Sequence, residues 1–590
     1  MYQFSCLEKI CRGALHVADL FFLLLSSDIS IYTKYYKMTN EQNETQADLN
    51  SKSDLSDGSL NQPEPITIES VMPDFDGKRW WQLSHIRKLS LCIFVVALTA
   101  CNNGYDGSVL NSLYSMPTFN HAIGNVDGAI LGCLTNGYVF GAFCSFFVNS
   151  YIVDRFGRKP GIQIGNISMI CGVIIQACAG SWRSSYPSDY KGRGVLGMLI
   201  GARVVIGLGA GLISIAAPSL ISELSFPTHR STCTAFYNSS WYLGAIVAAW
   251  VSYGTRNMSK DWCWRIPTIV QGFFPVLQSC LLLFCVDESP RFLVSKGKLE
   301  EARKVLSKCH GGGYKGSEIL VDYEMTEIQL AIQQERQASE ESSYKDFIRT
   351  AANRKRTWIL CCLGTFMQLS GNGLVSYYLS KVLISIGITS TSEQLVVNGG
   401  LMIYNWGCCL IQAFLIIPNI KRRHAFNFSL FGMLLCFVIW TILSAINQQR
   451  NFKQKDLGQG VLAMIFLYYF CYNVGLNGVP FTYVTEIMPF TLRGKGLNIF
   501  TFVQYIWMIY NGFVNSIAMS AIEWKYYIVY CCILAVESAI AYFTFVETSG
   551  HTLEEVAEVF GDSENLGKVS GMAALEEGKL KGDHEHVEYA

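Results

Sequence analysis

The chain has 590 residues, of which 50% are hydrophobic and only 16% are charged. Soluble domains usually carry about 25% charged residues, so the composition excludes an ordinary multidomain soluble protein. The formal net charge is zero, which gives no indication of nucleic acid as a partner, and the 21 Cys lie scattered through apolar runs without the Cys-x-x-Cys spacing of zinc or redox sites.

The N-terminal region, residues 1–88, is expected to be cytoplasmic and largely disordered, because residues 38–75 are polar. Its short apolar run, Leu20–Leu25, cannot cross a bilayer and lacks a convincing signal-peptide cleavage site. Met38 opens a polar stretch that reads like a natural N-terminus. Residues 1–37 are therefore interpreted as an upstream extension of the gene model, and a chain that begins at Met38 is expected to keep its function.

Apolar runs dominate the rest of the sequence. A helix that crosses a bilayer needs about 20 predominantly apolar residues. About twelve such runs follow one another, at 89–113, 127–150, 160–181, 194–221, 233–254, 266–286, 357–387, 396–417, 425–446, 461–486, 496–520 and 525–546. The pattern predicts an all-α membrane protein with twelve transmembrane helices.

A polar stretch divides the twelve runs into two groups of six and is expected to form short amphipathic helices, at Leu299–Cys309 and Tyr323–Arg336. Basic residues concentrate in this stretch and in three short loops on the same side, so this face is expected to be cytoplasmic. Several basic residues also fall in loops of the other face. The expected parts are two six-helix bundles, a cytoplasmic helical linker and a cytoplasmic tail, at 89–290, 357–547, 291–356 and 548–590 respectively.

The two groups of six share an internal repeat. A glutamate and an arginine seven residues apart, with a proline between them, occur once in each half, as Glu223, Pro227 and Arg230 and as Glu486, Pro489 and Arg493. The basic pair Arg158-Lys159 recurs as Arg422-Arg423, and Glu288 recurs as Glu547 at the end of the twelfth run. These features recur at similar offsets, which indicates two homologous bundles that rock against each other around a central site.

Short motifs mark the predicted helices and their ends. They are Gly104-Tyr105-Asp106, the run Asp154 to Lys159, the set Gly201, Arg203, Gly207, Gly209 and Gly211, the run Pro218 to Glu223, Trp264 to Pro267, Glu288 to Arg291, and Val546 to Gly550. Over roughly residues 89–560 this set resembles the sugar-porter family of the major facilitator superfamily. The segments 368–378 and 480–496 resemble most the fungal lactose-permease branch, near the hexose transporters. The resemblance implies a two-bundle fold and sugar transport by alternating access.

Charged residues recur at the cytoplasmic ends of the predicted helices in both halves. They are Asp154, Arg155, Arg158, Glu223, Arg230, Glu288 and Arg291 in the first half and Glu486, Arg493 and Glu547 in the second. As a repeated set they are interpreted as a gate that locks the outward-facing state through ion pairs between the bundles. Taken singly, each residue is better interpreted as an ordinary positive-inside charge or a helix cap.

Asp106 and Arg203 both lie within apolar runs. A lone charge at the centre of a bilayer costs about 2.5–3.5 kcal/mol on insertion scales, so such residues usually pair and usually serve a function. The resemblance implies that the two side chains face each other within the first bundle, and that an acid at this position accompanies proton symport. Asp106 and Arg203 are therefore predicted to couple proton and sugar movement, with a purely structural ion pair as the alternative.

Amide and aromatic side chains at helical spacing provide a candidate sugar site, because such groups must face a water-filled cavity. The candidate substrate residues are Asn238, Gln368, Asn372, Tyr377, Asn405, Gln504, Asn511 and Asn515. Several family positions differ. Met367-Gln368 stands where the family has paired glutamines, Gly373 replaces an asparagine, and the tryptophan of the tenth helix is missing. The resemblance therefore leaves the identity of the sugar open.

The sequence thus predicts a carrier of a small neutral sugar, a hexose or a lactose-like disaccharide, that moves together with a proton. It is expected to lie in the plasma membrane, with both termini cytoplasmic, and to function as a monomer. A proton-independent facilitator and a sugar sensor are the alternatives. The intact Arg230 and the short tail after Glu547 favour a transporter over a sensor. No nucleophile–base pair, phosphate loop or metal cluster stands out, so neither an enzyme nor a cofactor is expected.

Overall fold

The computed structural model describes residues 82–180, 191–258, 261–312, 314, 317–416, 420–450, 455–549, 556 and 559–561. The expected disordered N-terminus, including residues 1–37 and the start at Met38, and most of the expected tail lie outside these residues. The described part is almost entirely helical, because long apolar segments satisfy their backbone hydrogen bonds internally by forming helices.

The first half forms six transmembrane segments, the last of which is broken at Gly272. Their bounds are α3 (Ser84–Tyr114), α5 (Ala129–Phe156), α6 (Arg158–Cys178), α7 (Lys191–Leu224), α8 (Arg230–Thr255), and the pair α9 (Trp262–Gln271) and α10 (Phe273–Cys285). The short α4 (Pro117–Ile123) lies between α3 and α5, and the 3-10 turn η4 (Pro227–His229) precedes α8.

The second half repeats this order with more interruptions. Its bounds are α15 (Ala351–Leu369) and α16 (Asn372–Ser385), α17 (Thr391–Ile411) with η6 (Gln412–Ile416), α18 (Arg422–Gln449), α19 (Lys455–Tyr472) with η7 (Asn473–Asn477) and α20 (Val479–Ile487), η8 (Phe490–Leu492), α21 (Arg493–Ile522), η9 (Glu523–Lys525), and α22 (Tyr526–Thr544). Here η6 and η7 are π-helical turns.

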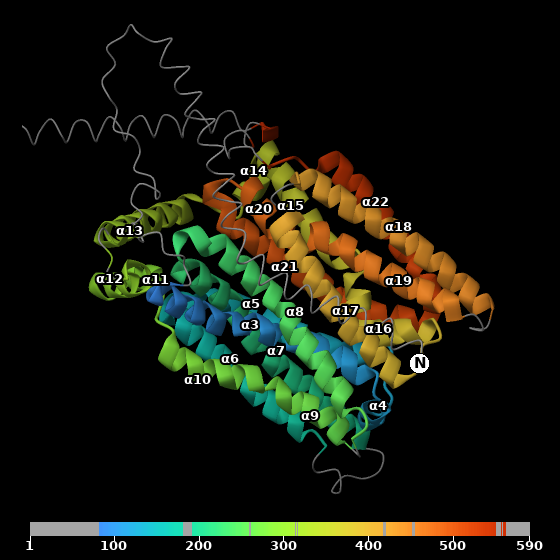
Figure 1. Cartoon of the computed structure of the whole chain (residues 1–590). Coiled ribbons are helices and arrows are strands. Elements are labelled where there is room, and N and C mark those ends of the chain that lie inside the picture. The colour runs from blue at the N-terminus through green and yellow to red at the C-terminus, as the bar shows by residue number, and fades with distance from the viewer. Residues whose placement is uncertain are drawn as a thin grey trace, which may run out of the picture. The chain divides into compact units, whose positions relative to one another are not determined.

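Each of the twelve predicted runs lies on one of these helices or helix groups. Within the described residues, ten segments are long and apolar enough to cross a membrane by length and composition. The helices α8 and α21 bring the number to twelve, and their polar side chains explain their lower hydropathy. The predicted twelve-helix fold is confirmed. Figure 1 shows helices α3 to α10, in blue to green, gathered beside helices α15 to α22, in yellow to red.

The polar linker is helical, as its amphipathic pattern predicts. It contains α11 (Pro290–Ser295), α12 (Leu299–Leu306), the π-helical η5 (Ser307–Gly311), α13 (Ser317–Glu341) and α14 (Asp346–Arg349). Helices α11 to α13 lie at one end of the transmembrane helices, and α4 lies at the other (Figure 1). We call these the linker end and the opposite end.

Close backbone approach sets the packing of α3 against α8 in the first half. A Cβ atom at Gly104 would collide with the carbonyl oxygen of Trp241, and one at Gly244 would collide with that of Cys101. Glycine is therefore required on both sides of this contact. The crossing holds α3, which carries Asp106, at a fixed distance from α8.

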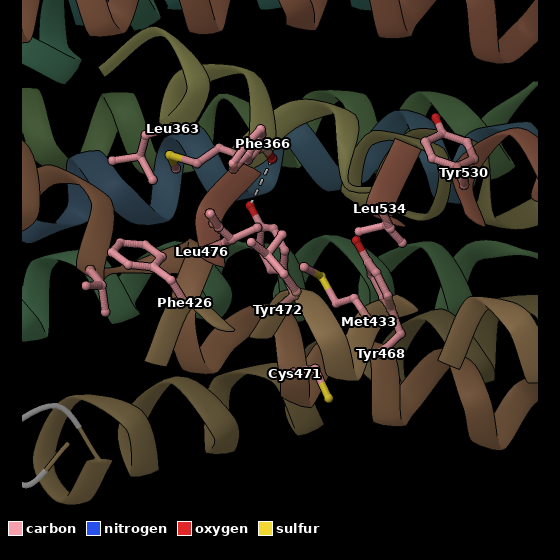
Figure 2. Packing of buried hydrophobic residues seen from close by; sticks show 14 of the residues in the cluster. Leu363, Phe366, Phe426, Met433, Tyr468, Cys471, Tyr472, Leu476, Tyr530 and Leu534 are labelled. Carbon is pink, nitrogen blue, oxygen red and sulfur yellow. Dashed lines mark hydrogen bonds between the residues drawn. The ribbon is translucent and has the colours of Figure 1, made fainter. Parts of the chain in front are cut away.

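The core of the second half is aromatic instead. The rings of Phe437 and Trp440 stack with centroids 4.9 Å apart, and Phe437 also stacks on Tyr530 at 5.4 Å. Figure 2 shows Met433, Tyr468 and Leu534 packed together, from α18, α19 and α22 respectively. The seventh transmembrane segment breaks beside this core at Gly371, whose φ of 104° favours glycine. The break ends α15 after Leu369 and starts α16 at Asn372.

Candidate proton and substrate site

The two predicted intramembrane charges come together in the first half. Asp106 on α3 and Arg203 on α7 are each 1% exposed. Nη1 of Arg203 donates to the backbone carbonyl of Asp106 at 3.1 Å, and Nε2 of Gln271 on α9 donates to Oδ1 of the Asp106 carboxyl. Oδ2 of Asp106 has no hydrogen-bond partner among the described residues. The guanidinium therefore contacts the backbone of Asp106, while the carboxyl binds Gln271 and keeps one oxygen without a partner among the described residues.

A polar network joins the two halves near the middle of their helices. The hydroxyl of Tyr242 on α8 donates to Oδ1 of Asn473 at 3.1 Å and accepts from Nδ2 of Asn477 at 3.3 Å. Nδ2 of Asn473 in turn lies 3.4 Å from Oδ1 of Asn405. The predicted Asn405 is thus part of this network, whereas the Nδ2 of Asn405 itself has no partner among the described residues.

The break in the seventh segment gathers more polar groups. Nδ2 of Asn372 donates to the hydroxyl of Tyr472 at 3.1 Å, and Oδ1 of Asn372 accepts from Ser376 at 2.9 Å. The Ser376 hydroxyl also lies 3.0 Å from the hydroxyl of Tyr469. These groups belong to α16 and α19, so the interrupted helix exposes hydrogen-bonding side chains next to a row of tyrosines.

The eleventh segment contributes amides to the same region. Nδ2 of Asn511 donates to the backbone oxygen of Gln368 at 2.6 Å, and Nε2 of Gln504 lies 2.9 Å from the sulfur of Met367. Oδ1 of Asn511 has no partner among the described residues. The structure therefore brings Gln504 and Asn511 beside the end of α15, where the sequence places Gln368.

Three predicted substrate residues lie differently. Oδ1 of Asn515 accepts from the hydroxyls of Tyr526 and Tyr530, at 2.8 and 2.6 Å, so this oxygen is occupied within the second half. Asn238 is exposed and Tyr377 is half-buried.

Contacts between the halves close the opposite end. The hydroxyl of Tyr378 on α16 lies 3.2 Å from that of Thr135 on α5 and donates to the carbonyl of Gly512 at 2.6 Å. Nδ2 of Asn398 on α17 donates to Ser112 on α3 at 3.0 Å. Further contacts between halves are those of Asn111 with Asn398, Asn136 with the backbone of Ile509, and Lys381 with Asp127.

At the linker end, each half contains the same cluster of charged residues, which we call a clamp. Arg158 pairs with Glu223 at 3.1 Å, and Arg422 pairs with Glu486 at 3.3 Å. The hydroxyls of Ser289 and Thr548 donate to these two glutamates. This correspondence supports the repeat read from the sequence.

The second part of each clamp is a carboxylate at a helix start. Glu288 accepts the backbone N–H groups of Arg158 and Lys159, at 3.1 and 3.2 Å, and Glu547 accepts those of Arg422 and Arg423, at 2.8 and 3.1 Å. Burial raises the pKa of the Glu288 carboxyl, and the backbone N–H donors oppose this rise.

The remaining predicted gate residues make looser contacts. Arg291 pairs with Glu335 of α13 at 2.5 Å, and Asp154 lies 4.0 Å from Arg158. Arg155 donates to the hydroxyl of Tyr151 at 2.6 Å. Arg230 and Arg493 are the first residues of α8 and α21. The ion pairs found at Arg158 and Arg422 in this conformation are therefore internal to each half.

Comparison with known proteins identifies the family. The family model described as "Sugar (and other) transporter" matches residues 92–560. The chain belongs to this family. It is a multi-pass membrane transporter of the major facilitator superfamily and not an enzyme, which confirms the resemblance read from the motifs.

Individual relatives of this transporter are distant. It is 28% identical over 465 residues to the MFS-type transporter oryC of Aspergillus oryzae, covering 78% of this chain and 82% of the relative. It is 25% identical to the low-affinity glucose transporter HXT3 of Saccharomyces cerevisiae, covering 87% and 90%. The inward open conformation of the xylose transporter XylE from E. coli matches with a TM-score of 0.66 and 19% identity, covering 80% of this chain and 99% of that one. This likeness shows the shared fold.

The transporter also contains polar residues at its centre that sequence reasoning missed. Gln271 binds Asp106, and Ser376, Tyr469, Tyr472 and Asn473 surround the predicted amides. The four-residue spacing of Asn473 and Asn477 within an apolar run was a usable signal, since it places two amides on one face of a helix. Gln271 lies seven residues before Gln278 in the sixth apolar run, which was a weaker signal of the same kind.

Proposed function

We propose that this transporter imports a small neutral sugar, a hexose or a lactose-like disaccharide, together with a proton, by alternating access. The observation that carries the proposal is the buried cluster of Asp106, Gln271 and Arg203. A buried carboxyl with one unsatisfied oxygen favours its protonated form, and closer approach of a guanidinium favours release of the proton. A conformational change that alters this distance therefore moves a proton.

The central amides and tyrosines are the proposed sugar site. Gln368, Asn372, Asn405, Gln504 and Asn511 carry amide groups that donate and accept, as sugar hydroxyls require. The proposed set also includes Asn238, Tyr377 and Asn515. We expect these three side chains to reach the sugar in another conformation of the transport cycle. The relatives HXT3 and XylE are named a glucose and a xylose transporter, which supports a monosaccharide ahead of lactose.

The charged residues of the linker end are the proposed gate. Contacts between the halves gather at the opposite end, which corresponds to a carrier open toward its linker side. In the reverse conformation we expect the charged ends of the two halves to meet and form ion pairs across the interface. We further propose that the linker end faces the cytoplasm at the plasma membrane, that both termini lie inside the cell, and that a monomer suffices.

The decisive experiment is sugar-induced proton uptake in cells that lack their own sugar carriers. Glucose, galactose, xylose, lactose and cellobiose are added in turn while external pH is followed. We expect alkalinisation with one of them, and we expect D106N to lose uphill accumulation while keeping downhill entry. E301Q, at the exposed linker ion pair of Glu301 with Lys298, is the matched control and should accumulate sugar normally.

Each outcome of this experiment distinguishes between the possible functions of the protein. Sugar entry without any pH change would identify a facilitator and would leave Asp106 a structural role. Full uphill accumulation by D106N would refute the coupling role of that residue. No entry of any sugar would favour a sensor or a non-sugar solute.

A further inference from the structure

A second acidic side chain lies deep in a transmembrane helix, and the proposed transport cycle does not use it. Glu537 is in the middle of α22 and is 3% exposed. Neither of its carboxyl oxygens has a hydrogen-bond partner among the described residues. Among the described residues, Cys362 on α15 and Tyr468 on α19 interact electrostatically with Glu537, and neither is a cation that could neutralise a carboxylate.

The internal repeat supplies the matching position in the first half. Glu537 lies ten residues before Glu547, and Gln278 lies ten residues before Glu288. Glu288 and Glu547 make the same contacts with the starts of α6 and α18, so they are structurally equivalent anchors. Gln278 on α10 is therefore the counterpart of Glu537 on α22.

Gln278 shows what this position does. Its Nε2 donates to the backbone oxygens of Val95 and Val96, at 2.9 and 3.2 Å, and to the hydroxyl of Thr99 at 2.7 Å. All three acceptors belong to α3, so the amide hydrogens of Gln278 fasten the sixth segment to the first. Its Oε1 accepts from Asn166 of α6 at 3.1 Å.

The second half presents the same kind of surroundings to a carboxyl. Cys362 follows Thr99 by 263 residues, the offset that also separates Glu223 from Glu486, and it lies on α15, which corresponds to α3. An ionised carboxylate can only accept hydrogen bonds, and no donor reaches Glu537 among the described residues. A carboxyl that holds a proton is neutral and can donate, as the amide of Gln278 does.

We propose that Glu537 is a second intramembrane proton-binding site, which holds its proton throughout the transport cycle. It occupies the position at which Gln278 joins α10 to α3 in the first half. The proton at Glu537 is resident, so it is distinct from the proton proposed to move with the sugar at Asp106. The inference does not rest on the coupling role of Asp106.

The test uses the full chain, purified and returned to lipid, with the variants E537Q, E537L and Q278E. Infrared spectra in H₂O and D₂O report the C=O stretch of protonated carboxyl groups. We expect E537Q to lose one such band and Q278E, the matched change in the first half, to gain one. Because glutamine reproduces the shape and the donor of a protonated glutamate, sugar uptake by E537Q should stay within about twofold of wild type. E537L should lose the same band and should fold at least as well as wild type, because it removes a buried polar group that has no partner among the described residues.

Three results would overturn the proposal. One is a carboxyl band region that is identical in wild type and E537Q, which would show an ionised Glu537. The second is a carboxyl band that E537L keeps, which would assign the band to another residue. The third is loss of uphill accumulation in E537Q, which would show that this proton travels. The infrared result needs no transport, so it stays informative even where D106N contradicts the coupling proposal.

Discussion

At the scale of single residues, two carboxylates do the same work in different halves. Glu288 and Glu547 each accept backbone N–H groups at the first turn of the helix that follows a basic loop, α6 and α18. The N-terminus of a helix has unsatisfied N–H groups and a positive dipole end, so a carboxylate there stabilises it. Because each glutamate follows the last transmembrane segment of its half, the clamp ties the third segment to the sixth and the ninth to the twelfth.

The duplicated clamp leads to a matched pair of predictions. E288Q and E547Q each exchange a charged acceptor for a neutral amide with one acceptor oxygen, and hydrogen bonds to charged groups contribute about 1.5–3 kcal/mol. We expect each variant to lose about 2 kcal/mol of stability, measured as thermal unfolding of the purified protein. E301Q is the control, because Glu301 forms an exposed ion pair with Lys298. Unequal losses at the two clamps would contradict their equivalence.

Sequence reasoning reached most of these residues by type and spacing. It paired Glu288 with Glu547 from the repeat, and it placed Asp106 and Arg203 near each other through the family resemblance. It did not find Gln271 or Glu537. The seven-residue spacing of Gln271 and Gln278 was a weak signal of a polar stripe in the sixth run, whereas Glu537 has no amide or charged partner at helical spacing in its run. The contact of Arg203 with the backbone of Asp106, rather than with its carboxyl, depends on side-chain packing that spacing does not encode.

At the scale of helices, close contact of α3 with α8 positions Asp106, the proposed proton site. The glycines at 104 and 244 lie against the backbone of the facing helix, at Trp241 and Cys101. Without a hydrophobic driving force between helices in lipid, such contacts depend on van der Waals packing of small residues. A larger side chain separates the helices and shifts Asp106 away from Arg203 and Gln271.

We therefore predict that G104A and G244A each destabilise the protein by about 1–3 kcal/mol, the usual range for overpacking. G201A is the control, because a Cβ at Gly201 of α7 meets nothing within 4 Å. Thermal unfolding and surface expression report the difference. A melting temperature for G104A equal to that of G201A would show that α3 and α8 move apart freely.

Helix number and order were predictable because apolar runs of membrane length have few other solutions. The positions of the helix breaks were not predicted from the sequence. The break at Gly371, for example, depends on the glycine and also on the ring of Phe437 that packs against it. The linker helices were expected at Leu299–Cys309 and Tyr323–Arg336. The structure ends the first α-helix at Leu306, continues it as a π-turn, and extends the second over Ser317–Glu341.

At the scale of the whole molecule, alternating access requires contacts between the halves that break in each cycle. Lys381 on α16 pairs with Asp127 at 2.7 Å and lies 3.4 Å from the hydroxyl of Ser520 on α21. This ion pair joins the second half to the loop between α4 and α5 at the opposite end. It forms only in the conformation in which that end is closed, so it adds to the stability of that conformation alone.

Neutralising this pair should favour opening of the opposite end. Asp127 is 70% exposed, and exposed pairs contribute about 0.2–1 kcal/mol, so the closed population falls by at most about fivefold. For K381M and D127N we expect a lower apparent KM for sugar uptake, because more carriers expose their site outward.

The effect should shrink at high salt, and the swapped variant K381D with D127K should return KM toward wild type. K298M, at the linker pair with Glu301, is the control. Additive changes in KM for K381M and D127N would show that the two charges act independently and that this ion pair does not hold the opposite end closed.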